Sequence, residues 1–143
     1  METEVKEVKS VRWYFLKRSL IIILILTVVV GAFFAFAALK AESRFALRNA
    51  KNALFAIEAV GIEHRGAGTP IFTEYSRDGF TEGVLSEVKK LSGCKGEIRI
   101  LEYDAETNSV IKMSYREKNF LVTYNMNKKK SWKLELIIEI ENL

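Results

Sequence analysis

The feature that most constrains this chain is an uncharged segment of 21 residues, from Ser19 to Leu39. Between Leu20 and Val30, every residue except Thr27 is apolar. At the α-helical rise of about 1.5 Å per residue, the segment reaches about 30 Å, which is the thickness of the hydrocarbon core of a bilayer. Because backbone amides in a bilayer must be paired within the segment, we expect a transmembrane helix over residues 19–39.

Burial of this segment in the core of a soluble protein is the alternative interpretation. The whole chain has 143 residues, so only roughly a hundred residues follow the segment. So few residues supply little surface with which to cover a helix that is apolar on every side. The composition therefore favours a membrane-anchored chain, with membrane lipid as its first partner.

Positive charge on the two sides of the segment predicts its orientation. Before it lie Lys6, Lys9, Arg12, Lys17 and Arg18, and after it, within a comparable distance, lie Lys40, Arg44, Arg48 and Lys51. The excess precedes the segment, and Trp13, Tyr14 and Phe15 suit the headgroup level. We therefore expect residues 1–18 to form a cytoplasmic basic tail, with the C-terminal part of the chain extracytoplasmic in the cell membrane.

A cleaved signal peptide is the second alternative for the same segment. A basic start, an apolar stretch and the small-residue triplet from Ala35 to Ala37 resemble a secretory signal with a cleavage site after Ala37. The uncharged span continues beyond that site to Leu39, which favours a retained single-pass anchor. Both interpretations leave residues 40–143 on the far side of the membrane.

An amphipathic helix is expected to continue the anchor through residues 40–60, because neither proline nor glycine interrupts the chain between Leu39 and Gly61. Apolar residues, most of them small, recur there at steps of three and four, namely Ala46, Ala50, Ala53, Ile57 and Val60. This pattern predicts a stripe to which another element packs closely. A helix from Trp13 to Val60 is about 70 Å long.

Residues 61–79 are rich in glycine and polar side chains, which is typical of a connecting loop. The glycines and the proline of this stretch are Gly61, Gly66, Gly68, Pro70 and Gly79. It also holds the only histidine, His64, between Glu63 and Arg65 and without a second ligand-type residue at helical or hairpin spacing. We expect a solvated loop histidine rather than a metal ligand or catalytic base.

A short helix is expected after this loop. Asp78 or Thr81 is placed to cap its N-terminus, and Gly93 follows its last turn at about Leu91. The apolar residues that share one face are Phe80, Val84, Val88 and Leu91. We expect this face to pack on a sheet.

From Gly96 onward the apolar period changes from nearly four to two, which predicts strands. The four expected strands are residues 97–103, 110–115, 120–126 and 132–140. The last places Trp132, Leu134, Leu136, Ile138 and Ile140 on one side. Connections of three to six residues suit an antiparallel meander, whose one face the amphipathic helix would cover. The fold class is therefore α+β, with residues 61–143 as the extracytoplasmic domain.

No catalytic motif is evident in the chain, so we expect no enzyme, cofactor or metal. It has no glycine-rich phosphate loop, and its single Cys94 and single His64 give no sign of a nucleophilic relay. Cys94 is expected to be a structural or incidental thiol. The carboxylates that come closest to a pair are Glu97, Glu102, Asp104 and Glu106, which we expect to be solvated on strand exteriors and turns.

The basic run of residues 128–130 raises the question of nucleic acid. Three lysines in a turn between strands are a common solubilising feature, and residues 40–143 carry 17 basic against 15 acidic side chains. This balance does not resemble an electrostatic footprint for nucleic acid. We expect no nucleic-acid partner.

The order of these elements resembles a type IV pilin or pseudopilin, including the pilin-like proteins of tight-adherence pilus systems. The resemblance is architectural and spans nearly the whole chain: a short basic tail, an apolar helix, an amphipathic extension, a glycine-rich connector and a meander. It implies that residues 20–39 pack in a filament core or wait in the membrane, and that residues 96–140 are displayed outside.

The chain departs from this family at the peptidase motif. Members that a prepilin peptidase processes carry a glycine before the cut and a glutamate five residues into the apolar segment. Here no Glu lies between Ser19 and Leu39, and Gly31 lies deep in the segment. The resemblance thus implies a pilin-like or accessory component of a pilus or of a type II or type IV-related secretion apparatus that stays anchored.

Two functions follow as expectations. The first is noncatalytic assembly with other pilin-like or secretion-apparatus subunits, as a homo- or hetero-oligomer, by lateral helix packing along Ala46, Ala50, Ala53, Ile57 and Val60. The alternative is a membrane-tethered or secreted α+β module that binds a ligand. They differ in whether the domain folds without residues 40–60.

Overall fold

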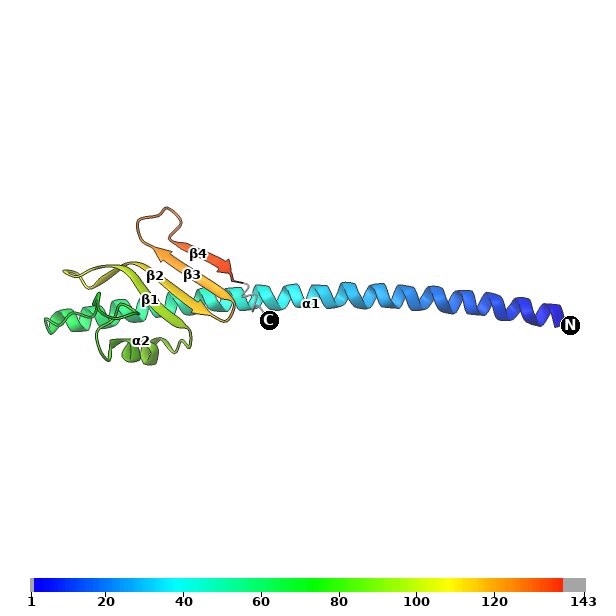
Figure 1. Cartoon of the computed structure of the whole chain (residues 1–143), viewed down its shortest axis with the longest axis horizontal. Helices are drawn as coiled ribbons and strands as arrows, with labels where there is room; N and C mark the ends of the chain where they lie inside the picture. Colours follow the sequence, from blue (N-terminus) through cyan, green and yellow to red (C-terminus); the bar gives the residue numbers. More distant parts are fainter. Residues whose placement is uncertain (1, 138–143) are drawn as a thin grey trace. The chain divides into compact units, whose positions relative to one another are not determined.

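A computed structural model describes the backbone of residues 2–137 and the side chains of residues 13–137. The chain divides into two compact units, Met1–Ala41 and Glu42–Leu143. Helix α1 (Glu2–Gly66) contributes to both units, and the remaining elements belong to the second unit (Figure 1). The expected start of the α+β domain was residue 61. The second unit begins earlier because residues 42–60 of α1 supply part of its core.

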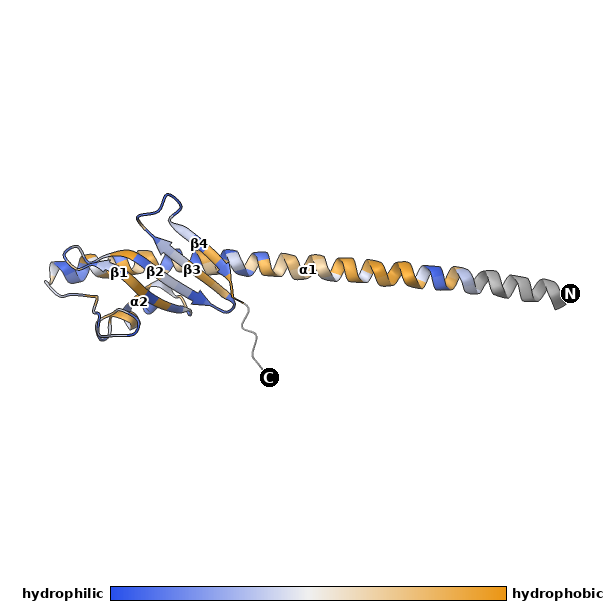
Figure 2. Cartoon of the chain, turned by 45° about the horizontal axis from the view of Figure 1, so that its top comes forward, coloured by the Kyte–Doolittle hydropathy of each residue, from blue (hydrophilic) through white to orange (hydrophobic). Residues whose placement is uncertain are grey.

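In the first unit, α1 is one continuous helix, as expected for residues 19–39. Its apolar part is orange in Figure 2. In the described part of the chain, α1 is the single helix that is long and apolar enough to cross a membrane. Its apolar side chains are exposed between Leu20 and Leu39, as a surface that faces lipid requires.

Helix α1 continues past Gly61, where we had expected it to end. A Cβ atom on Gly61 would lie 2.7 Å from the carbonyl oxygen of Asn108, so the glycine permits two backbones to approach each other. The helix ends instead at Gly66. The amide of Thr69 donates to the carbonyl of His64 (2.9 Å), and that of Gly68, with φ +69°, donates to Arg65 (3.1 Å). This pattern is a Schellman motif.

Four strands form one antiparallel sheet in the order β1-β2-β3-β4, which confirms the expected meander. The strands are β1 (Glu97–Asp104), β2 (Ser109–Glu117), β3 (Phe120–Asn125) and β4 (Trp132–Leu136). Tyr115 lies opposite both Ile98 and Val122, and Val122 lies opposite Leu134, so these residues share one face. Ile138 and Ile140, expected in the last strand, lie outside the described residues.

Helix α2 (Val84–Ser92) is shorter than expected at its start. Gly83, which has no side chain to form a cap, occupies the N-cap position, and the two expected caps have other partners. Asp78 Oδ1 accepts hydrogen bonds from Ser76 Oγ (2.8 Å) and from the amide of Phe80 (3.1 Å). Thr81 Oγ1 donates to the carbonyl of Pro70 (3.1 Å). Gly93, with φ +66°, ends the helix as expected.

The core of the second unit lies between the sheet, α1 and α2. Helix α1 contributes seven buried residues, namely Ala46, Ala50, Ala53, Leu54, Ala56, Ile57 and Val60. Phe80, Val84 and Val88 are buried as expected, whereas Leu91 is 60% exposed. Small side chains on α1 allow the helix axis to approach the sheet closely, so that the larger Met113, Tyr115 and Val122 fill the space between them.

Candidate functional site

The five residues expected to form a packing stripe on α1 lie in the core of their own chain. They are Ala46, Ala50, Ala53, Ile57 and Val60, and each is at most 2% exposed. The stripe therefore does pack against another element, but that element is the sheet of the same chain. In this structure none of the five side chains is accessible to a neighbouring subunit.

A polar network joins α1 to the sheet at one end of this contact. Glu117 Oε2 accepts hydrogen bonds from Asn49 Nδ2 (2.8 Å) and from Tyr115 Oη (3.0 Å). Tyr115 Oη in turn accepts a hydrogen bond from the amide of Gly96 (3.2 Å). Burial raises the pKa of Tyr115, and the hydrogen bond to Glu117 raises it further. The polar groups of the network are hydrogen-bonded to one another, which is typical of a structural contact between two elements.

A second link between α1 and the sheet lies on the surface. Lys118 Nζ donates to Glu42 Oε1 at 2.6 Å, and this hydrogen bond raises the pKa of Lys118. Lys118 follows β2 in a left-handed conformation, with φ +51°. Both side chains are exposed, so the pair adds little to stability, but it fixes the β2–β3 turn beside the start of the second unit.

His64 lies in the last turns of α1 rather than in a loop. Its Nδ1 lies 2.9 Å from Thr69 Oγ1, and its Nε2 lies 3.3 Å from Glu87 Oε2 on α2. These contacts tie the C-terminus of α1 to α2. The described residues contain no group of three or more His, Cys, Asp or Glu side chains that could hold a metal ion.

The other candidate reactive groups are engaged locally. Cys94 is buried, with its Sγ 2.9 Å from Ser92 Oγ. Arg99 binds Glu97 Oε1 through Nη2 (2.6 Å), and this hydrogen bond lowers the pKa of Glu97. Asp104 accepts hydrogen bonds from Thr107 Oγ1 (2.6 Å) and from the amide of Glu106 (2.9 Å), which lower its pKa. Neither carboxylate faces a second carboxylate across a cleft.

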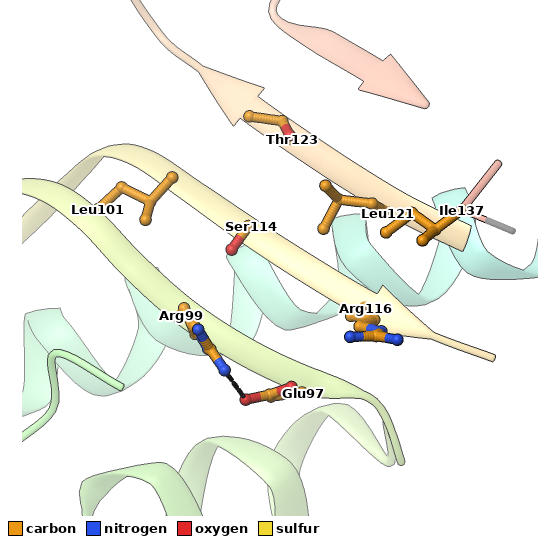
Figure 3. Close-up of a pocket in the computed structure, with 8 residues that line it drawn as sticks. All are labelled: Glu97, Arg99, Leu101, Ser114, Arg116, Leu121, Thr123 and Ile137. Atoms are coloured by element: carbon orange, nitrogen blue, oxygen red, sulfur yellow. Dashed lines mark hydrogen bonds and ion pairs between the residues drawn. The ribbon is translucent and has the colours of Figure 1, made fainter. Parts of the chain in front are cut away.

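Sequence reasoning did not identify a depression on the face of the sheet opposite α1. Its volume is about 350 Å³, and Figure 3 shows the side chains that line it pointing away from α1. They are Glu97, Arg99, Leu101, Ser114, Arg116, Leu121, Thr123 and Ile137. Guanidinium groups beside apolar side chains could bind a ligand that carries both a carboxylate and an apolar part.

A second exposed surface lies on α1, on the side of the helix away from the buried stripe. Phe55 and Ile62 are 66% and 68% exposed, and Ala59 lies between them at steps of four and three. Phe55 and Ala59 also line a shallow groove together with Leu91 of α2. The alternation of apolar residues predicted this helix to be amphipathic, but it did not distinguish these exposed residues from the buried stripe.

Comparison of the chain with protein-family models, with curated proteins and with solved structures gives no match. The candidate surfaces are therefore interpreted from their own geometry. The surface formed by Phe55, Ala59, Ile62 and Leu91, called the helix surface below, suits contact with another apolar element. The depression on the sheet suits a small polar ligand or a peptide.

Proposed function

We propose that this protein is a noncatalytic, membrane-anchored assembly component, similar to a pilin, of a pilus or related secretion apparatus. The observation that carries the proposal is that one helix, α1, supplies both the apolar segment and seven residues of the domain core. In an anchor that only tethers a module, the helix and the domain need no common core. A shared core couples lateral contacts of the helix to the displayed sheet.

In this proposal the residues that meet neighbouring subunits differ from those the sequence predicted. The buried stripe on α1 is committed to the sheet, so neighbours would contact the apolar segment of residues 19–39 and the helix surface. Phe55 and Ile62 are large and exposed, which is costly in water unless another apolar element covers them. The N-terminus is cytoplasmic and residues 40–143 are extracytoplasmic.

Site-specific photocrosslinking in cells of the source organism tests this assignment. A benzophenone amino acid replaces Phe55 on the helix surface and, as a matched control, Tyr75, a fully exposed aromatic residue in the connecting segment. We expect adducts of the 16.3 kDa chain with itself or with other anchored subunits from position 55 and few from position 75. Equal yields at the two positions, or a monomer at both, would contradict the proposal.

A second function, a membrane-tethered ligand-binding module, is supported by the depression on the sheet. Arg99 and Arg116 lie there together with Leu121, and an acidic peptide with an apolar side chain would compete with Glu97 for the guanidinium of Arg99. The probe is a length-matched pair of peptides, one acidic and one neutral, titrated onto the detergent-solubilised full chain. Binding of the acidic peptide alone, weakened at least about tenfold by Arg99→Gln, would support the module.

A further inference from the structure

Strand β4 forms an edge of the sheet, and the backbone on its outer side faces away from β3. The amide of Asn125 donates to the carbonyl of Ser131 (2.8 Å), and that of Ile137 donates to Asn119 (2.7 Å). Odd-numbered residues of β4 therefore direct their backbone groups toward β3. Because these groups alternate in direction along an antiparallel strand, Trp132, Leu134 and Leu136 direct theirs to the open edge.

The same even-numbered residues leave apolar surface uncovered on the helix side of the sheet. Leu134 lies opposite the fully buried Val122, and Leu136 lies opposite the buried Phe120, so all four side chains point to that side. Leu134 is nevertheless 37% exposed and Leu136 49% exposed. The core of the unit covers β1 to β3 and leaves the leucines of β4 at its margin.

We propose that β4 pairs antiparallel with β4 of a second copy of this chain. A two-fold axis perpendicular to the sheet, midway between the two strands at Leu134, places Leu134 opposite Leu134 of the second copy and Trp132 opposite Leu136 of the second copy. Both pairs consist of residues whose backbone groups point to the open edge, as the ladder requires. The two sheets become one, with four strands from each copy. This pairing does not depend on a pilin-like function.

Charge selects this register over its neighbours. Within one chain Lys133 Nζ pairs with Glu135 Oε1 (2.6 Å). With the axis at Leu134, Lys133 lies opposite Glu135 of the second copy, so this pair can be exchanged for pairs of opposite charge across the two strands. Moving the axis to Lys133 would set two lysines opposite each other, and moving it to Glu135 would set two glutamates opposite each other. Like charges directly opposite are unfavourable, so the register centred on Leu134 is the most favourable of these three.

The symmetry also determines the relative direction of the two copies. The axis reverses the direction of β4, and it therefore reverses residues 42–66 of α1 in the second copy as well. The full chain in detergent is the sample for the tests that follow.

Disulfide crosslinking tests the contact at the axis. In a Cys94→Ser background, Leu134→Cys brings two thiols together at the axis, within the separation of Cα atoms that a disulfide permits. The matched control is Leu101→Cys, which replaces an exposed leucine of the other edge strand, β1. We expect oxidised dimer from position 134 and little from position 101. Equal yields would overturn the proposal.

Charge reversal tests the register. Lys133→Glu sets carboxylates opposite each other, and Glu135→Lys sets ammonium groups opposite each other. Each single change should raise the dimer dissociation constant by about fivefold or more, and the double change should restore it. Analytical ultracentrifugation of the full chain in detergent measures the constant. A dimer that is insensitive to all three variants would use another surface, such as α1, and would refute the proposal. A chain that remains monomeric throughout would also refute it.

Discussion

Gly61 and Gly66 are equivalent in the sequence, since each is a glycine that could end a helix. In the structure they differ, because a Cβ atom at Gly61 meets the backbone of Asn108 whereas one at Gly66 has nothing within 4 Å. The reason for a glycine at position 61 thus lies in a segment far along the chain. Local patterns describe the helix but contain no information on which backbone approaches it, so the end of α1 was misplaced.

Gly61→Ala should destabilise the second unit, because the new methyl group would lie 2.7 Å from the Asn108 carbonyl oxygen. Overpacking of this kind costs about 1–3 kcal/mol. Gly66→Ala is the matched control in the same helix and should be neutral or slightly stabilising. Urea unfolding in detergent, followed by the fluorescence of Trp132 in a Trp13→Phe background, measures both. Equal effects of the two substitutions would show that Asn108 does not constrain position 61.

Tyr115→Phe should lower the free energy of unfolding at neutral pH by about 1–3 kcal/mol, because Glu117 loses a donor and the amide of Gly96 loses its acceptor. The pKa of Tyr115 is raised in the folded chain, so the unfolded chain ionises first as the pH rises above its ordinary value of 10.0. The contribution of Tyr115 is therefore complete below pH 10 and decreases above it.

The measurement is urea unfolding of the parent chain and the Tyr115→Phe variant between pH 8 and pH 11. The difference in stability between them should shrink above pH 10, by at most about 1.4 kcal/mol per pH unit. Tyr75→Phe, at a fully exposed tyrosine, is the control and should leave the pH profile unchanged. A constant difference across this range would mean that Tyr115 ionises equally in the folded and unfolded chain.

At the scale of elements, the sequence predicted the helix, the four strands and their order, because apolar periodicity and short connections are local properties. It also predicted that Ala46, Ala50 and Ala53 lie on one face. The sequence pattern did not distinguish a helix face that packs on the chain's own sheet from one that packs on a neighbouring subunit, since both require small apolar residues. Leu91 was misplaced for a similar reason: it shares a face with the buried Val84 and Val88 but is 60% exposed, and the apolar pattern does not show where the cover of that face ends.

Residues 62–143 should fail to fold alone, because they lack the seven core residues that α1 contributes. Residues 42–143, which retain them, should give a folded α+β domain. Circular dichroism and the dispersion of amide resonances distinguish the two outcomes. A folded fragment of residues 62–143 would mean that α1 is only a tether, and the ligand-binding module would then become the better interpretation.

At the scale of the whole molecule, the boundary between the two units lies at residue 41, within helix α1. An apolar segment and a folded domain are thus covalently joined by helical backbone. Neither composition nor the positive-inside comparison fixes the function of such an arrangement, because surface contacts decide it. The depression on the sheet depends on such contacts, since its residues come from β1, β2 and β3 and from Ile137, which follows β4.

Cysteine labelling of the full chain tests the proposed orientation. In a Cys94→Ser background, Asn127→Cys in the exposed β3–β4 turn should react with a membrane-impermeant maleimide added to intact spheroplasts. Ser10→Cys, before the apolar segment, should react only after the membrane is permeabilised. The reverse pattern of labelling would mean that the topology is inverted. An intact mass that lacks residues 1–37 would indicate cleavage after Ala37.

The bond between Asn49 and Glu117 joins residues 68 positions apart, and its two ends emerge from the ribosome at different times. At synthesis rates of about 5–20 residues per second, the second end follows the first by about 3–14 s. During that interval the alanine-rich face of α1 has no sheet to cover it. Newly made chains thus pass through a period in which a translocation partner or chaperone can bind this face, and that period lasts at least until β2 has been made.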